Sequence, residues 1–262
     1  EVEAWSLPAN GCPLLERIET LVQPALLRGV FGDSATLRVA GVQYHLCGAA
    51  DTRELAHLAG IGPGDHVLDV ACFLGGPAVQ LASEFGCEVT GIDISPVAIG
   101  GARRIAVLAG LADRLHYEVA DGARLPFADG TFDVVWNQAS LLHQEAWLDE
   151  MVRVLKSGGR LAITFEARPG PPQQGSPRWS IDEMVAQWVQ RGLRVVRLDD
   201  LTEREIAQGW GGLIARLDAH EETFAAVLGH PWVDAARAQF AGEIAAMRAG
   251  RWTNARMIAV KG

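Results

Sequence analysis

The chain has 262 residues, of which 49% are hydrophobic, and it carries a formal net charge of -9 with a pI near 5.3. Nucleic acids and anionic membranes bind clustered Lys and Arg, which this sequence lacks, so we predict a small-molecule partner and no nucleic-acid or membrane partner. A chain of this length and hydrophobic content can bury one large core. We expect one domain with added helices, as a monomer or a homodimer.

The cysteines and the apolar runs indicate the setting of the protein. The four cysteines, at positions 12, 47, 72 and 87, show neither a CxxC pattern nor the His/Cys spacing of a zinc site. No apolar run is long enough to span a bilayer, and the start "EVEAWSLPANGC" lacks the basic and apolar regions of a signal peptide. We therefore expect no metal site and a cytoplasmic protein with free thiols.

The first 50 residues are predicted to form a helical N-terminal lid. Within them, "PLLERIETLVQPALLRGVF" is predicted to be a helix that Pro24 interrupts, because proline removes a backbone donor and clashes within a helix. We expect this segment to pack over the sheet that follows.

Residues 51–202 are predicted to form the core of the fold. From residue 64 the chain alternates short β-branched apolar runs with longer helical patterns, which is typical of βαβ units. This pattern predicts an α/β fold with a doubly wound, Rossmann-like sheet of seven mostly parallel strands. The expected strands are 66–71, 88–94, 115–120, 132–138, 160–167, 194–200 and 255–262, and the expected helices between them are 76–86, 96–110 and 146–159.

The end of the chain departs from this alternation. Residues 203–250 have a helical, tryptophan-bearing pattern and are predicted to be a cap inserted before the final core strand, which lies in 251–262. The loop "ARPGPPQQGSPR" follows the fifth strand, at the edge where open α/β sheets bind ligands.

Acidic residues follow three successive predicted strands: Asp69, Asp93 and Asp121. An Asp in this position is also an ordinary cap or turn residue, so the spacing carries the argument. Asp93 stands roughly 20 residues past the first strand turn, where an acid accepts hydrogen bonds from the hydroxyls of a ribose. The sequence has neither a P-loop lysine nor GxGxxG after the first strand, so it predicts a nucleoside ligand other than a triphosphate or a dinucleotide.

Three motifs together resemble those of the class I S-adenosylmethionine-dependent methyltransferases. They are "HVLDVACFLGGPAVQLASEFGCEVTGIDIS", "DGARLPFADGTFDVVWNQ" and "RVLKSGGRLAITF". Upstream, "YHLCGAADTRELAHLAGIGPGD" is similar to the segment that covers the cofactor in a small-molecule subset of that family. The resemblance extends over about residues 42–200 and implies S-adenosylmethionine as the cofactor, with S-adenosylhomocysteine as the product.

The resemblance assigns cofactor-binding roles residue by residue. It implies that Asp69 and the turn after it hold the amino-acid end of the cofactor, that Asp93 binds the ribose and that Asp121 binds the adenine amine. The backbone around Asn137 would face the methionine moiety, and Tyr44 resembles a residue that closes over it. The cofactor-binding residues implied in this way are Tyr44, Asp69, Ala71, Phe73, Gly75, Asp93, Ile94, Asp121, Gly122 and Asn137.

The loop after the first strand departs from the family pattern Asp-x-Gly-x-Gly-x-Gly, because it has Asp69, Ala71, Phe73 and Gly75 at those positions. Glycine there permits positive φ and close approach to a ligand, and we expect Ala71 to be tolerated at negative φ. Phe73 has three interpretations: it packs away on a helix, it shapes the pocket against a sulfonium or substrate, or it marks a site that has lost its ligand. The retained acids and glycine favour an open site.

The segment "WNQASLLHQ" is similar to the "WxQDAxLHS" element of bacterial glycine, sarcosine and dimethylglycine methyltransferases. The family's acid falls on Ala139, which removes an amine ligand and argues against a simple glycine derivative as substrate. Gln138 is a matched substrate-binding candidate. His143 is the candidate general base or substrate hydrogen-bond partner, since a neutral imidazole accepts a proton near physiological pH. Its alternative role is to cap or orient the following helix.

Two of the eight tryptophans are candidates for a substrate pocket. Trp179 follows the Pro/Gly-rich loop, and Trp210 lies in "GWGG", whose glycines predict a mobile lid. Aromatic walls suit a ring substrate or a cationic amine.

The sequence leaves three hypotheses for the function. The first is methyl transfer from S-adenosylmethionine to a small-molecule nitrogen or oxygen nucleophile. The second is an enzyme of the same fold that uses the bound sulfonium in a cyclisation, decarboxylation or rearrangement. The third is a non-catalytic binding protein. The acids favour the first hypothesis, and Ala71 and Phe73 favour the other two.

Overall fold

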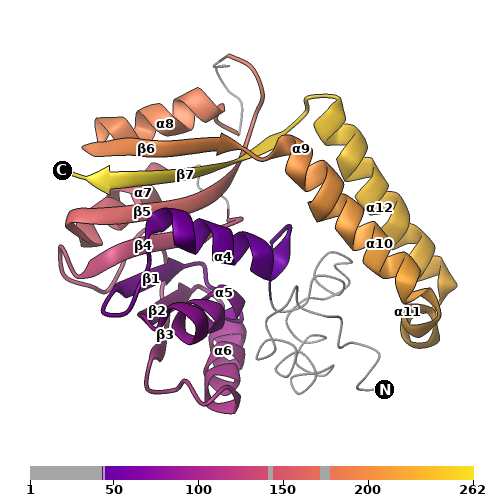
Figure 1. Cartoon of the computed structure of the whole chain (residues 1–262), viewed down its shortest axis with the longest axis horizontal. Helices are drawn as coiled ribbons and strands as arrows, with labels where there is room; N and C mark the ends of the chain where they lie inside the picture. The colour runs from indigo at the N-terminus through magenta and orange to yellow at the C-terminus, as the bar shows by residue number, and fades with distance from the viewer. Residues whose placement is uncertain (1–42, 44, 141–143, 172–177) are drawn as a thin grey trace.

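The computed structural model describes residues 43, 45–140, 144–171 and 178–262 (Figure 1). Of the predicted lid, residues 1–50, only residues 43 and 45–50 belong to this part of the chain. The predicted fold class is confirmed: seven strands form one sheet in the order β3-β2-β1-β4-β5-β7-β6, parallel except for β7, which runs antiparallel to both of its neighbours. The strands are β1 (His66–Val70), β2 (Glu88–Asp93), β3 (Leu115–Val119), β4 (Phe132–Gln138), β5 (Leu155–Ala167), β6 (Leu193–Asp200) and β7 (Thr253–Lys261).

The order of the strands places the site. The chain proceeds outward from β1 to β2 and β3, and then returns to the other side of β1 with β4. Ligands of doubly wound sheets bind at such a reversal, outside the carboxyl ends of the strands. Asn137 joins the two strands there, because its side-chain amide donates to the carbonyl oxygen of Val70 at 2.7 Å.

Helices cover both faces of the sheet, as the strand pattern requires. Successive residues of a strand point to opposite faces, so Val67 belongs to one hydrophobic cluster and Leu68 to the other. The helices contributing buried side chains to the first cluster are α4 (Gly48–Ala59), α5 (Gly76–Gln80) with the π-helical turn η2 (Leu81–Phe85), and α6 (Pro96–Leu108); those contributing to the second are α7 (Glu145–Val154) and α8 (Ile181–Gln190).

Between β6 and β7 the chain forms a helical insertion, residues 202–248, which has a core of its own. Phe224 and Phe240 are buried in that core, and the ring of Trp210 lies 5.8 Å from that of Phe240. In Figure 1 the long helices of the insertion extend away from the end of the sheet. Its elements are α9 (Thr202–Arg204), η3 (Glu205–Trp210), α10 (Gly211–Ala219), α11 (Glu221–Leu228) and α12 (His230–Arg248).

Ion pairs fasten α4 to the antiparallel end of the sheet. Arg256 on β7 is 3% exposed and pairs with Glu54 at 2.9 Å and with Asp199 at 3.0 Å. Arg204, at the start of the helical insertion, pairs with Asp51 at 3.3 Å and also with Glu54. These contacts hold α4, the last two strands and the insertion together around the site.

One local prediction is wrong. The helix expected over 146–159 ends at Val154, and β5 begins at Leu155 rather than at residue 160. The "GWGG" segment lies where η3 passes directly into α10, within the helical pattern predicted for 203–250. Within the described residues, none of the helices is both long and apolar enough to cross a membrane.

Candidate functional site

The loop after β1 keeps the backbone of a glycine-rich turn without most of its glycines. Ala71, Phe73 and Gly75 have φ values of 61°, 53° and 73°. Ala71 therefore does not have the negative φ at which its extra methyl group is tolerated without strain. A non-glycine residue in this left-handed region costs about 1–2 kcal/mol, so surrounding contacts must hold the loop in place.

Asp93 supplies one of those contacts. Its Oδ2 accepts a hydrogen bond from the backbone N–H of Phe73 at 3.0 Å, and its Oδ1 accepts one from the N–H of Ser95 at 2.8 Å. The side chain of Phe73 is half-buried and packs against the first hydrophobic cluster. The carboxylate thus fixes the loop and the start of α6, and each oxygen retains a second lone pair for a ligand hydroxyl.

Asp69 is the buried acid of the site. It is 2% exposed at the end of β1, and none of the described residues donates a hydrogen bond to its Oδ2. Burial, followed by the negative charge of Asp93, raises the pKa of Asp69 to about 8. A buried acceptor without a donor is costly, so this atom fits a ligand that brings a cation or an N–H group.

A cavity of about 210 Å³, here called the small cavity, opens beside these acids. It lies between the loop after β1 and the end of β4. The residues that line it are His45, Asp69, Ala71, Cys72, Phe73, Pro77, Asp93, Gln138, Ala139 and Ser140.

Ile94, Asp121 and Gly122 lie at the ends of the neighbouring strands β2 and β3 and do not line the small cavity. Ile94 is 72% exposed, and Asp121 is exposed with its Oδ1 accepting the N–H of Ala123 at 2.9 Å. A Cβ added to Gly122 would lie 2.7 Å from the indole of Trp147. The apolar side chain and the acid thus remain accessible beside the cavity.

Asn137 and Gln138 connect the end of β4 to other elements. The side chain of Asn137 is buried and exchanges hydrogen bonds with the hydroxyl of Ser140. Gln138 accepts from Thr52 at 3.0 Å and donates to Asp51 at 3.1 Å, and both partners belong to α4. Gln138 therefore positions α4 while it also lines the small cavity.

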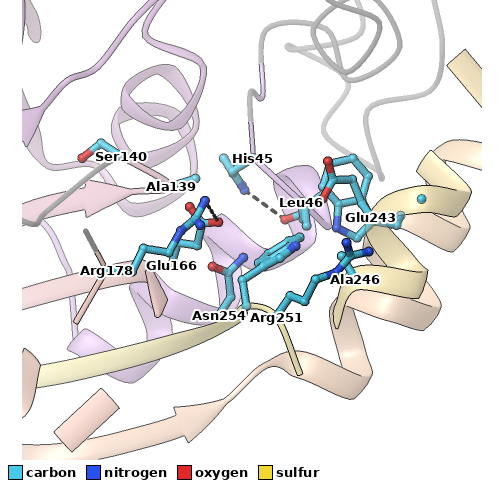
Figure 2. Close-up of a pocket in the computed structure, with 13 residues that line it drawn as sticks. His45, Leu46, Ala139, Ser140, Glu166, Arg178, Glu243, Ala246, Arg251 and Asn254 are labelled. Atoms are coloured by element: carbon cyan, nitrogen blue, oxygen red, sulfur yellow. Dashed lines mark hydrogen bonds and ion pairs between the residues drawn. The ribbon is translucent and has the colours of Figure 1, made fainter. Parts of the chain in front are cut away.

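A second cavity, of about 570 Å³ and here called the large cavity, lies between the sheet edge and the helical insertion (Figure 2). Its wall contains the ion pair of Arg178 with Glu166, at 2.9 Å, and the indoles of Trp210 and Trp252, whose ring centres are 6.2 Å apart. The residues that line it are His45, Leu46, Ala139, Ser140, Glu166, Arg178, Trp210, Gly242, Glu243, Ala246, Arg251, Trp252 and Asn254.

Three residues line both cavities: His45, Ala139 and Ser140. Burial lowers the pKa of His45, although the carboxylate of Asp51 opposes this effect. Ala139 has φ 56°, and its backbone N–H donates to the Thr164 hydroxyl at 3.1 Å. Sequence reasoning missed His45, and the available signal was its place beside Tyr44 in the segment similar to a cofactor cover.

The remaining predicted residues are distributed as follows. Tyr44 and His143 lie outside the described residues. Trp210 lines the large cavity, whereas Trp179 packs against the second hydrophobic cluster and lines neither cavity. Within the described part of the chain, no group of His, Cys, Asp and Glu side chains could hold a metal ion.

Residues 67–159 match the model of a family described as a methyltransferase domain. The chain is 42% identical to 27-O-demethylrifamycin SV methyltransferase of Amycolatopsis mediterranei over 129 residues. The aligned region makes up 47% of this chain and 47% of the relative. The chain spans about half the length, or less, of the first curated relatives that it matches.

Two solved structures are similar in fold. Phosphoethanolamine N-methyltransferase 2 of Haemonchus contortus, in complex with phosphomonomethylethanolamine and S-adenosylhomocysteine, has a TM-score of 0.78 and 21% identity, covering 90% of this chain and 59% of the other. The [4+2]-cyclase SpnF has a TM-score of 0.66 and 25% identity, and the match covers 81% of this chain and 80% of the other.

Proposed function

We propose that the chain is a class I S-adenosylmethionine-dependent methyltransferase, which the match of residues 67–159 to a methyltransferase-domain family supports, and that it transfers a methyl group to a nitrogen or oxygen atom of a small molecule. The observation that carries the proposal is the loop after β1, in which the three left-handed residues Ala71, Phe73 and Gly75 are held by the Phe73 N–H bond to Asp93. The loop therefore has the backbone path that glycine provides in the family pattern.

The residues of the small cavity fit the cofactor. The unsatisfied Oδ2 of Asp69 suits the ammonium of its amino-acid end, and Asp93 suits its ribose hydroxyls. Ile94 and Asp121 offer an apolar and an acidic contact to the adenine. When bound, S-adenosylmethionine supplies a methyl group that is activated by a positively charged sulfur. The protein must then align a nucleophile and manage its proton.

The large cavity suits the methyl acceptor. Its volume of about 570 Å³ falls within the roughly 300–1,000 Å³ typical of small-molecule sites. Two indoles and an ion pair on its wall favour an acceptor with both apolar rings and polar groups. Similarity to a methyltransferase named for a demethylrifamycin supports an acceptor much larger than glycine.

Calorimetric titration with S-adenosylmethionine and S-adenosylhomocysteine tests the cofactor. We expect both to bind, and no heat with either would remove the proposal. Aromatic hydroxyl compounds and amines are then screened as methyl acceptors. The screen measures the formation of S-adenosylhomocysteine and the mass of each acceptor. The expected result is one equivalent of S-adenosylhomocysteine for each methyl group gained by the acceptor.

The likeness to the [4+2]-cyclase SpnF favours one second candidate, a non-methylating reaction of a substrate beside the bound cofactor. The same screen separates the two. An acceptor that rearranges without gaining a methyl group, and without S-adenosylhomocysteine formation, would support the second candidate and contradict methyl transfer.

A further inference from the structure

The turn after β3, residues 121–124, carries the acid that the proposed function places against the adenine. The backbone N–H of Arg124 donates to the carbonyl oxygen of Asp121 at 2.9 Å, which closes the turn. The side chain of Asp121 is oriented by the same turn, because its Oδ1 accepts the N–H of Ala123 at 2.9 Å. A carboxylate accepts about four hydrogen bonds, so this group can also accept from a ligand. Where the carboxylate lies therefore depends on where the turn lies.

One face of α7 holds the turn and the residues that follow it. Glu150 accepts the backbone N–H of Leu125 at 2.7 Å. Arg153 donates to the carbonyl oxygen of Leu125 at 3.1 Å and to that of Phe127 at 2.7 Å, and it pairs with Glu150 at 2.6 Å. Trp147 stands three residues before Glu150 on α7, and residues at this spacing lie on the same face of a helix.

Trp147 is the part of that face that reaches the turn itself. A Cβ on Gly122 would lie 2.7 Å from Cδ2 and from Cε2 of the indole and 3.1 Å from Cε3, so the ring lies directly against the glycine. Gly122 is buried and its φ is outside the left-handed region, so the indole, rather than the backbone angle, requires glycine here. Trp147 is half-buried and packs against the second hydrophobic cluster. The ring thus limits how closely the turn approaches α7.

We propose that Trp147 is a positioning residue for the cofactor: by supporting Gly122, it holds the Asp121 carboxylate where that group accepts a hydrogen bond from the adenine amine. The inference rests on the proposed function. Trp147 acts through the turn, since its indole contacts Gly122 and the carboxylate contacts the ligand. A carboxylate only accepts hydrogen bonds, so in this position it favours a base with an amine over a base with a carbonyl oxygen. The site is then specific for adenine over hypoxanthine.

Calorimetric titration with S-adenosylhomocysteine and with S-inosylhomocysteine tests this role. The second compound has a carbonyl oxygen where adenine has its amine. We expect wild-type protein to bind the adenosyl compound about 10- to 100-fold more tightly, the equivalent of one hydrogen bond to a charged acceptor. Trp147→Leu leaves space beside Gly122, and we expect this preference to fall by about tenfold. An unchanged preference in Trp147→Leu would overturn the proposal.

Trp232→Leu is the matched control. It makes the same exchange on a half-buried tryptophan that packs against the core of the helical insertion and lines neither cavity. We expect this variant to lose stability in urea unfolding and to keep the wild-type preference for the adenosyl compound. An equal loss of preference in both tryptophan variants would show that any loss of packing weakens the site, and it would overturn the specific role of Trp147.

A second set of variants tests the contact between the indole and the turn. Gly122→Ala places a Cβ against the indole, so the turn must move, and we expect the preference for the adenosyl compound to fall. In the double variant Gly122→Ala/Trp147→Leu the smaller side chain makes room, so we expect a greater preference than in Gly122→Ala alone. No recovery in the double variant would show that the indole does not hold the turn, against the proposal.

The wild-type titrations keep this inference and the proposed function separate. If neither compound binds, the proposed function is overturned and this inference with it. If S-adenosylhomocysteine binds with no preference over S-inosylhomocysteine, the adenine role of the turn and of Trp147 is overturned, whereas methyl transfer from the cofactor stands.

Discussion

The phenol ring of Tyr117 lies against the Cα of Gly75, so that a Cβ on residue 75 would be 2.8 Å from Tyr117 Cζ. The same ring also covers Gly91 on β2, where an added Cβ would lie 2.7 Å from ring carbons. Tyr117 is 4% exposed, and none of the described residues forms a hydrogen bond with its hydroxyl. The one family glycine kept in the loop is therefore required by packing from β3 as well as by its backbone angle.

Gly75→Ala should destabilise the protein. The substitution combines a left-handed φ of 73° with overlap against Tyr117, and the two effects together predict a loss of about 2–4 kcal/mol in the free energy of unfolding. Urea unfolding measures it. Gly100→Ala is the control, because it lies exposed in α6 with no atom within 4 Å of an added Cβ. Equal stability of the two variants would show that Tyr117 does not pack as described.

Ala71→Gly should have the opposite effect. Glycine adopts the φ of 61° seen at Ala71 without steric cost, and after its greater unfolded-state entropy is subtracted we expect a gain of roughly 0.5–1 kcal/mol. Ala235→Gly, at an exposed site inside α12, should lose roughly 0.5–1 kcal/mol in the same unfolding experiment. A loss of similar size in both variants would contradict the left-handed conformation at residue 71.

The binding of S-adenosylhomocysteine should release a proton from Asp69. The pKa of this carboxyl is raised to about 8 by burial and by Asp93, so the group is protonated in the free protein below that pH. A ligand ammonium requires the ionised form, so affinity should rise by up to about tenfold per pH unit as pH approaches about 8 and then level off. Calorimetric titration in buffers of different ionisation enthalpy measures the number of protons released on binding.

Asp69→Asn is the matching variant for that experiment. It should bind weakly and show no such rise in affinity with pH, because the amide does not titrate. The same pH dependence in wild type and Asp69→Asn would show that another group is responsible.

Asp93→Ala should weaken the affinity for S-adenosylhomocysteine by about 10- to 100-fold, the equivalent of losing hydrogen bonds to a charged acceptor. Part of this loss comes from the Phe73 N–H, which loses its partner in the variant. Asp113→Ala, an exposed acid before β3, serves as the control and should bind as wild type does. Unchanged affinity in Asp93→Ala would exclude this acid from the nucleoside site.

Glu205→Gln should change how stability depends on pH. Burial raises the pKa of Glu205 from its ordinary 4.5 to about 8, against the hydrogen bond donated by Asn254. The folded state then holds a proton that the unfolded state has lost, so the free energy of unfolding falls as pH rises from about 4.5 to about 8. In thermal unfolding, the stability of Glu205→Gln relative to wild type should increase as pH rises across that range. The stability of the exposed variant Glu203→Gln relative to wild type should not change with pH.

Local periodicity predicted the sheet well. β4 has the predicted bounds, Phe132–Gln138. The boundary between α7 and β5 was misplaced since Leu155, the first residue of "LKSGG", pairs with Phe132 on β4, and the strand continues through pairs of residues 160–167 with β4 and β7, all of them partners distant in the sequence. Such partners are invisible to a window of neighbouring residues.

The site could be predicted where a role depends on position along a strand, and not where it depends on cavity shape. Asp69 and Asp93 are found at strand ends, next to the small cavity, as their spacing indicated. His45 reaches the junction of the cavities only through contacts with Gln43 and Thr52, which the sequence does not reveal. Likewise, the preferences of alanine do not predict the positive φ of Ala71, which lies in a loop that Asp93 contacts through the N–H of Phe73.

The placement of the helical insertion between two adjacent strands has a consequence for redesign. β6 and β7 are paired along their length, so the two ends of residues 202–248 emerge side by side from a rigid support. A foreign segment of different length that keeps Arg204 and its pairs with Asp51 and Glu54 could be grafted onto these ends while Asp69, Asp93 and His45 stay where they are, because none of these three residues belongs to the insertion. Exchange of this one segment should therefore retarget the acceptor while the nucleoside site keeps its affinity.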